Sequence, residues 1–253
     1  MKLTKDNYFS RESNQEYMSV SQYKSFLDCE ARTIAEIRGE WEPVKTVSML
    51  VGSYVDAYFE GSLPKFTAEN LDIFTMKGEL RSEYRQAERI IERIEQDELF
   101  MEMLSGKKQV IKTGELCGVP FKIKIDSYHE GKAIVDLKVM KDFAPVYREG
   151  KGRLSFIEGW GYDLQGAVYQ HIEGNRLPFY IVAATKEREP DIGIWRINQN
   201  ELDICLELMR DKVQHFALLK EGIGEPARCE KCDYCKRTKK LTEIKDSREL
   251  NYE

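Results

Sequence analysis

Residues 121–139, FKIKIDSYHEGKAIVDLKV, contain two strand-like segments separated by a turn at residues 130–132. Apolar and polar side chains alternate on both sides of the turn, which is typical of strands with one buried face. The apolar faces of the two strands coincide if the turn has three residues. A hairpin with that register places Asp126 directly opposite Asp136.

Two carboxylates on neighbouring strands, with Cβ atoms about 4.5–5.5 Å apart, repel each other unless a cation lies between them. Oxygen ligands of this kind suit Mg²⁺ or Mn²⁺. Lys138 points to the same side as Asp136. Its ammonium group can orient a water molecule or stabilise charge that develops on a phosphate. The hairpin alone leaves two interpretations open: a catalytic metal site, or the solvated polar face of an ordinary hairpin.

The order Asp126, Asp136, Lys138 across a hairpin resembles the core of the PD-(D/E)xK nuclease superfamily. Further along the chain, residues 161–170 read GYDLQGAVYQ and place Gln165 and Tyr169 on one helical face. This resembles the Q-x-x-x-Y motif of the RecB-like branch, which also follows the lysine in that branch.

Upstream, residues 51–61 read VGSYVDAYFEG and resemble the G-x-x-x-H helix of the same branch. Gly52 matches the glycine and leaves room for a close approach, but Asp56 stands where the family has a histidine. Asp56 is interpreted either as a hard oxygen ligand for Mg²⁺ or as a surface acid beside a degraded site. Glu60 lies one turn further along the same face and is a candidate for supporting or replacing a ligand.

The resemblance implies a mechanism as well as a fold. One or two Mg²⁺ ions, or Mn²⁺, would be bound by oxygen atoms of Asp56, Asp126, Asp136 and the backbone carbonyl of Leu137. Lys138 would orient the attacking water, and Gln165 and Tyr169 would position the DNA strand. Tyr169 has a simpler explanation as a core aromatic residue.

The cysteines give a second pattern. Cys229, Cys232 and Cys235 form a C-x₂-C-x₂-C run, and Cys29 lies some 200 residues upstream. Zinc ribbons usually pair two cysteines at each end of a longer insert, whereas three close cysteines with a remote fourth are nearer to [4Fe–4S] ligation. The pattern also resembles the iron–sulfur subset of RecB-like nucleases, including the AddB type. That resemblance implies a structural [4Fe–4S] cluster, with zinc or free thiols as alternatives.

Composition indicates a single globular domain. The 253 residues are 42% hydrophobic and 33% charged, with a net charge of −5. This charge argues against a protein that coats nucleic acid in general, but is compatible with a local basic cleft. We find neither a run of about 18–20 apolar residues nor a secretory leader, so a cytoplasmic protein with no membrane partner is expected. The sequence also lacks H-E-x-x-H and P-loop motifs, which argues against a metalloprotease or an ATPase.

The predicted fold class is α/β, with a restriction-endonuclease-like mixed sheet flanked by helices. We expect a mainly helical part at 19–106, a catalytic core at 107–220 and a cysteine-rich basic tail at 221–253. The predicted helices are 19–38, 47–59, 82–104, 162–173 and 200–220. The predicted strands are 107–113, 119–127, 132–139, 178–185 and 192–197, with a long loop at 140–161.

The overall resemblance is to exonucleases of the RecE (exodeoxyribonuclease VIII) type from phage recombination. It implies Mg²⁺-dependent digestion of linear double-stranded DNA from its ends, with a single-strand annealing protein and further copies of the chain as partners. Two alternatives stay open. One is a structure-specific or single-strand endonuclease of the same superfamily. The other is a catalytically decayed iron–sulfur protein that binds DNA.

Overall fold

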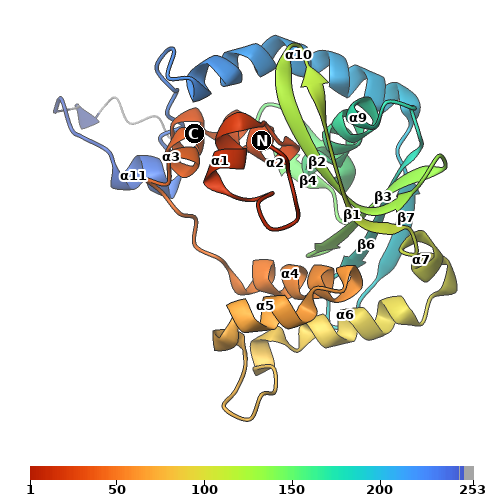
Figure 1. Ribbon diagram of the computed structural model, residues 1–253. Helices are drawn as coiled ribbons and strands as arrows, with labels where there is room; N and C mark the ends of the chain where they lie inside the picture. Colours follow the sequence, from red (N-terminus) through yellow and green to blue (C-terminus); the bar gives the residue numbers. More distant parts are fainter. Residues whose placement is uncertain (245, 248–253) are drawn as a thin grey trace.

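The computed structural model describes residues 1–244, 246 and 247 (Figure 1). Within these residues, five strands form one mixed sheet in the order β1-β2-β3-β6-β7. Their bounds are β1 Lys107–Leu116, β2 Val119–His129, β3 Ala133–Met140, β6 Phe179–Thr185 and β7 Ile192–Arg196. β3 and β6 run parallel, and the other neighbouring strands are antiparallel. The predicted mixed central sheet is confirmed.

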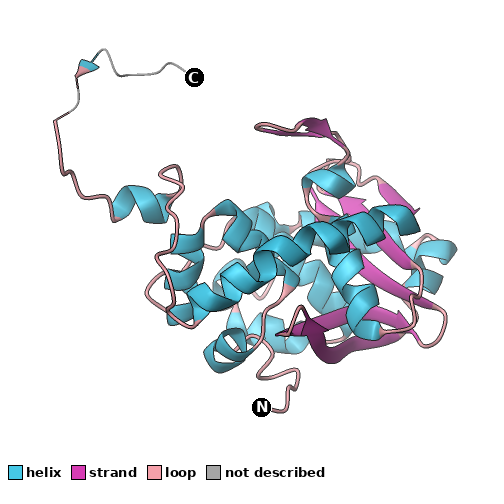
Figure 2. Ribbon diagram, turned by 90° about the horizontal axis from the view of Figure 1, so that it is seen from above, coloured by secondary structure: helices cyan, strands magenta, loops and turns pink. Residues whose placement is uncertain are grey.

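Helices cover both faces of the sheet (Figures 1 and 2). One face carries α2 (Val20–Asp28), α3 (Glu30–Arg38), α9 (Tyr162–Glu173) and α10 (Gln199–Lys220), which share a core with β2 and β6. The other face carries α4 (Val47–Glu60), α6 (Gln86–Glu95) and α7 (Glu98–Met103), which pack on β3 and β6. The sheet is therefore buried on both sides, as a strand with a parallel neighbour requires.

Shorter elements connect these layers. They are α1 Arg11–Glu16, α5 Leu63–Glu69, η1 Leu71–Ile73, η2 Ser82–Tyr84, β4 Val146–Arg148, β5 Gly152–Leu154, α8 Phe156–Gly159 and α11 Asp233–Arg237. The expected long loop at 140–161 is thus wrong in part, since it contains a two-stranded hairpin and a short helix. The hydroxyl of Ser155 and the carboxylate of Glu158 form a capping box that begins this helix.

Two predicted helices are interrupted: the first is divided into two elements and the second into three, of which η2 is the first. The helix expected at 19–38 is interrupted at Cys29, whose backbone is extended at φ −166° and ψ 108°. The helix expected at 82–104 is interrupted before Asp97, whose carboxylate accepts a 2.8 Å hydrogen bond from the Phe100 N–H and begins α7. Side-chain capping at Asp97 competes with continuation of the helix, which apolar periodicity does not reveal.

The predicted register of the central hairpin holds at its turn end. Ser127 pairs with Val135, and His129 pairs with Ala133, across a three-residue turn. The ladder ends there, one pair before Asp126 and Asp136.

The expectation that the apolar faces of the two strands coincide is wrong beyond this point. Ile123 and Ile125 pack toward α9 and α10, whereas Val135 and Leu137 pack beneath α4 and α6. β1 is distorted beside this point, where Gln109 adopts a left-handed backbone conformation with φ 56°. The strands therefore separate where the two acids lie.

None of the helices in the described ranges combines the length and the apolar character that crossing a bilayer requires.

Candidate active site

Asp136 lies on β3 at the point where β2 and β3 separate, and it is 2% exposed. Its Oδ1 accepts a 2.7 Å hydrogen bond from Nε2 of Gln165, on α9. Its Oδ2 forms an ion pair with the ammonium group of Lys138, yet accepts no hydrogen bond. The structure thus joins three of the predicted residues around one buried carboxylate.

Asp126 fills the gap left by the interrupted ladder. Its Oδ2 accepts a 3.1 Å hydrogen bond from the backbone N–H of Leu137, and its Oδ1 accepts one of 3.1 Å from the side chain of Gln109. The carboxylate therefore takes the place of a β2 carbonyl as the partner of β3. Leu137 contributes its N–H to the site. Its carbonyl as a metal ligand, which the resemblance implies, stays a prediction.

Asp56 and Glu60 reach the same region from α4. Both line a cavity of about 370 Å³ together with Asp126, Asp136 and Lys138. Gly52 is not required for a close approach between α4 and the sheet. A Cβ added there would lie 3.8 Å from Val139 Cβ and from Lys186 Nζ, which is ordinary van der Waals contact. The helix therefore presents Asp56 to the cavity without an unusually close approach to β3.

Tyr169 is both a core residue and a neighbour of the site. It is 8% exposed and lies edge-on to Phe179, with ring centroids 5.9 Å apart. Its hydroxyl donates a 3.0 Å hydrogen bond to the carbonyl of Lys124 on β2. Tyr169 thereby fixes α9 against the strand that carries Asp126.

Gly166 lets α9 approach the sheet closely. A Cβ at this position would lie 2.6 Å from Cδ1 of Phe179 and 2.9 Å from Cδ2 of Leu202. Such distances are far inside van der Waals contact. The glycine beside Gln165 is therefore what allows that amide to reach Asp136.

The carboxyl groups of the cavity share an unfavourable electrostatic environment. Burial and then Asp136 raise the pKa of Asp126 well above its ordinary value. The pKa of Asp56 is also raised, first by the loss of water around its carboxyl group and then by the charges of Asp136 and Glu60. The residue is nevertheless exposed where it lines the cavity. Burial opposes the charge of Lys138, but Asp136 and Asp126 outweigh burial and raise the pKa of its ammonium group.

These carboxylates fit a hard divalent cation by their chemistry. A cation would relieve the repulsion between these carboxylates that raises the neighbouring pKa values. Among the described residues, the ligand atoms of four cysteines all lie within 4.8 Å of one another. The carboxylate oxygens of three or more acids do not form such a group. Mg²⁺ usually keeps several waters and takes only one or two carboxylates, so this spacing suits it.

Several residues of the site were not predicted. The ring of Tyr162 lies between two ammonium groups, 5.6 Å from Nζ of Lys24 and 5.4 Å from Nζ of Lys138. Lys24 donates a 2.9 Å hydrogen bond to the carbonyl of Trp160, and burial and then Lys138 lower its pKa to about 8. Tyr162 could have been found three residues before Gln165, on the same helical face. Lys24 and Gln109 carry no comparable local signal.

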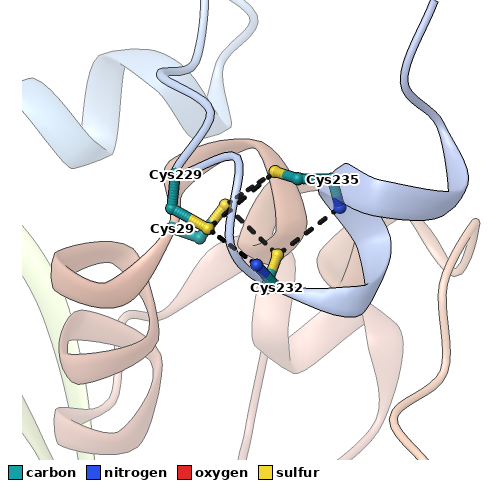
Figure 3. A group of neighbouring side chains, drawn as sticks. All are labelled: Cys29, Cys229, Cys232 and Cys235. Carbon is teal, nitrogen blue, oxygen red and sulfur yellow. Dashed lines mark hydrogen bonds between the residues drawn. The ribbon is translucent and has the colours of Figure 1, made fainter. Parts of the chain in front are cut away.

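The four predicted cysteines meet away from this cavity, where the C-terminal tail lies against α3 (Figure 3). Cys29 occupies the break between α2 and α3, and Cys232 caps α11. The backbone N–H groups of Cys232 and Cys235 donate to the sulfurs of Cys229 and Cys232, at 3.3 and 3.5 Å. This group could hold a metal ion, and it would then link the two ends of the chain.

The separations between the sulfur atoms bear on the kind of metal centre. Sγ of Cys29 lies 3.6 Å from Cys235 and 3.8 Å from Cys232, and all four sulfurs lie within 4.8 Å of one another. One tetrahedral ion with Zn–S bonds of about 2.3 Å requires separations of about 3.8 Å. A [4Fe–4S] cluster binds each cysteine to a different iron and places its own atoms between the sulfurs. The four sulfurs thus form a group that could hold a metal centre, and the choice between the expected [4Fe–4S] cluster and a zinc ion stays a prediction.

Residues 19–238 match a family described as "PDDEXK-like domain of unknown function (DUF3799)". The crystal structure of a putative exonuclease from Eubacterium rectale is similar over 97% of both chains, with a TM-score of 0.93 and 48% sequence identity. No curated protein sequence matches the chain. The matched residues include the hairpin acids, Gln165 and all four clustered cysteines, and the shared fold has the restriction-endonuclease-like mixed sheet. The chain belongs to the PDDEXK-like family.

Proposed function

We propose that this protein is a metal-dependent deoxyribonuclease that digests linear double-stranded DNA from its ends. The observation that carries the proposal is the single cavity in which Asp56, Asp126, Asp136 and Lys138 gather, with Gln165 bonded to Asp136. Family membership supports phosphodiester hydrolysis. The similarity to the Eubacterium rectale protein, a putative exonuclease, supports action from DNA ends.

Asp126 and Asp136 would hold Mg²⁺ or Mn²⁺ through carboxylate oxygens, and Asp56 would bind it through one of the waters that the cation keeps. When bound, the cation would polarise the scissile phosphate and lower the pKa of the attacking water. Gln165 keeps Asp136 in place by binding Oδ1, and Oδ2 contacts the ammonium group of Lys138, which also lines the cavity. The N–H of Leu137 and the amide of Gln109 hold Asp126 in the same way. Glu60, on the same wall, is placed to support Asp56.

The ammonium group of Lys138 pairs with Oδ2 of Asp136 at the wall of the cavity. In this position it would also contact the scissile phosphate and stabilise the charge that develops on it. Both Lys138 and Lys24 contact the ring of Tyr162. Lys24 is thus a second cation available to the DNA backbone.

The four cysteines would hold one structural zinc ion. The sulfur separations support this in place of the [4Fe–4S] cluster that the family resemblance implies. The ion would fix the end of α2, and the beginning of α2 lines the active-site cavity through Ser19, Ser21 and Lys24. Its role would be to position α2. A role in phage recombination, an annealing partner and a homo-oligomer stay predictions from the resemblance.

The test compares an end-labelled linear duplex with a covalently closed circle of the same sequence, each with Mg²⁺ and with EDTA. We expect Mg²⁺-dependent loss of the linear duplex only. Cleavage of the circle would favour the endonuclease alternative, and loss of neither DNA would contradict the proposed function.

A further inference from the structure

An exposed aromatic ring stands at the wall of the active-site cavity. Tyr8 and Phe9, which precede α1, both line that cavity. Tyr8 is 6% exposed, whereas Phe9 is 69% exposed. Their rings meet edge to face, with centroids 5.0 Å apart. Tyr8 is therefore packed into the protein while it presents Phe9 to the solvent of the cavity.

A buried lysine fixes this arrangement. Lys122 is 1% exposed, and its ammonium group donates to the carbonyl of Tyr8, to Oγ of Ser13 at 2.8 Å and to Oδ1 of Asn14 at 2.7 Å. Burying an ammonium group is costly, and burial lowers the pKa of Lys122 to about 8. The buried ammonium group of Lys122 thus holds the segment before α1 against β2.

Positive charge adjoins the exposed ring. Nζ of Lys124 lies 4.7 Å from the centroid of Phe9, and Lys124 is two residues before Asp126 on β2. No carboxylate among the residues described in the structure pairs with Lys124. Lys24 lines the same cavity. An exposed aromatic ring next to ammonium groups is the combination with which proteins bind a nucleobase and its adjoining phosphate.

We infer that Phe9 stacks on a base of the DNA strand that enters the cavity, and that Lys124 contacts the phosphate next to that base. The inference rests on the proposed nuclease function and adds the form of the substrate. Bases inside a duplex stack on neighbours at both faces, and only the terminal pair keeps one face open. An unpaired terminal nucleotide offers a free face on a flexible backbone, so the inference adds that ends with a single-stranded overhang bind better than blunt ends.

The test measures stacking separately from cleavage. A single-stranded oligonucleotide with 2-aminopurine near its end is titrated with protein in Ca²⁺, and fluorescence reports both stacking and affinity. We expect quenching by the wild type. In Phe9→Ala, quenching should be lost and affinity should fall about 5- to 150-fold, from the usual energy of base–aromatic stacking. Phe9→Trp should retain both, and so should Leu71→Ala, which removes another exposed side chain outside the cavity.

An abasic oligonucleotide separates stacking from a structural effect of the substitution. Without the stacked base, the wild type and Phe9→Ala should bind equally well, because the partner of the ring is gone. Wild-type affinity and quenching in Phe9→Ala would overturn the inference, even if the protein digests DNA. Conversely, a stacking signal from a protein that cleaves no DNA would leave this site in place and refute only the nuclease function.

Discussion

The side-chain amide of Gln165 donates a 2.7 Å hydrogen bond to Oδ1 of Asp136, across the boundary between α9 and the central sheet. Residues 29 positions apart are thereby held as one unit. Because Gln165 is 8% exposed and Asp136 is 2% exposed, water does not compete freely for this bond. Asp136 is consequently fixed before any cation or DNA arrives, which lowers the cost of binding either.

Replacing Gln165 should therefore weaken metal binding more than folding. In Gln165→Ala we expect the Mg²⁺ concentration for half-maximal cleavage to rise about 10- to 100-fold, the usual effect of losing a group that orients a metal ligand. Rates measured across a Mg²⁺ series check this. Gln214→Ala, on the exposed side of α10, is the matched control. An unchanged Mg²⁺ requirement in Gln165→Ala would show that the hydrogen bond has no such role.

The close approach of α9 to β6 predicts a destabilised Gly166→Ala variant. Alanine favours a helix by about 1 kcal/mol over glycine, but its Cβ would lie 2.6 Å from the Phe179 ring. We expect a net loss of about 1–3 kcal/mol in the free energy of unfolding, as for other overpacked cores. Gly52→Ala is the control, since its Cβ has 3.8 Å of space, and this variant should be at least as stable as the wild type. Equal stability of both variants would contradict the packing described for α9.

The hydrogen bonds of Glu173 should make the free energy of unfolding depend on pH. Its buried carboxylate accepts hydrogen bonds from Tyr128 at 2.7 Å, from Asn175 and from Lys112. Burial opposes the charge, but these bonds outweigh burial and lower the pKa of Glu173 to about 2. The unfolded value is about 4.3, so the stabilisation is complete above that pH and is lost as the pH falls toward 2.

Glu173→Gln should therefore lose about 1–3 kcal/mol at pH 7, the usual cost of a missing charged hydrogen bond in a buried site. The difference from the wild type should shrink as the pH falls from about 4.3 toward 2. Urea unfolding at several pH values checks both statements, with the exposed Glu189→Gln as control. A difference that is constant with pH would contradict the assigned cause.

The cysteine group predicts the metal content of the protein. Protein purified without oxygen should contain one zinc ion per chain and no visible absorption from iron–sulfide bonds. Cys29→Ser should lose the zinc and unfold at a lower temperature, because the link between α2 and the tail is gone. Cys205→Ser, outside the group, should keep the metal. Four irons per chain would show that the sulfurs move apart to hold a cluster.

Local patterns in the sequence predicted much of the site. The period-two alternation around Asp126 and Asp136 predicted the hairpin and its turn. Helical spacing put Gln165 and Tyr169 on one face, and the resemblance to the Q-x-x-x-Y motif implied that they lie near the acids, where they contact β3 and β2. What local patterns missed is where the ladder ends. Gln109 distorts β1 with a positive φ, and no residue-type rule places a glutamine there. That distortion lies beside the point where β2 and β3 separate.

Contacts between distant segments were also outside the reach of sequence patterns. Lys24 reaches the cavity because α2 crosses beside α9, and Phe9 does so because Lys122 holds the segment before α1. The helix break at Cys29 was missed because apolar periodicity continues through it, from Phe26 to Ile34. In each case the deciding partner lies far along the chain.

Cleavage by an Asp136 variant tests the central claim most directly. End-labelled linear duplex is incubated with wild type, Asp136→Asn and the exposed control Asp72→Asn, in Mg²⁺ and in EDTA. Asp136→Asn keeps the shape of the side chain and an acceptor for Gln165, but it removes the charge that would hold a cation. We predict that wild type and Asp72→Asn digest the duplex only in Mg²⁺, and that Asp136→Asn is slower by orders of magnitude while it remains folded. Wild-type digestion by Asp136→Asn would contradict the assignment of this cavity as the active site.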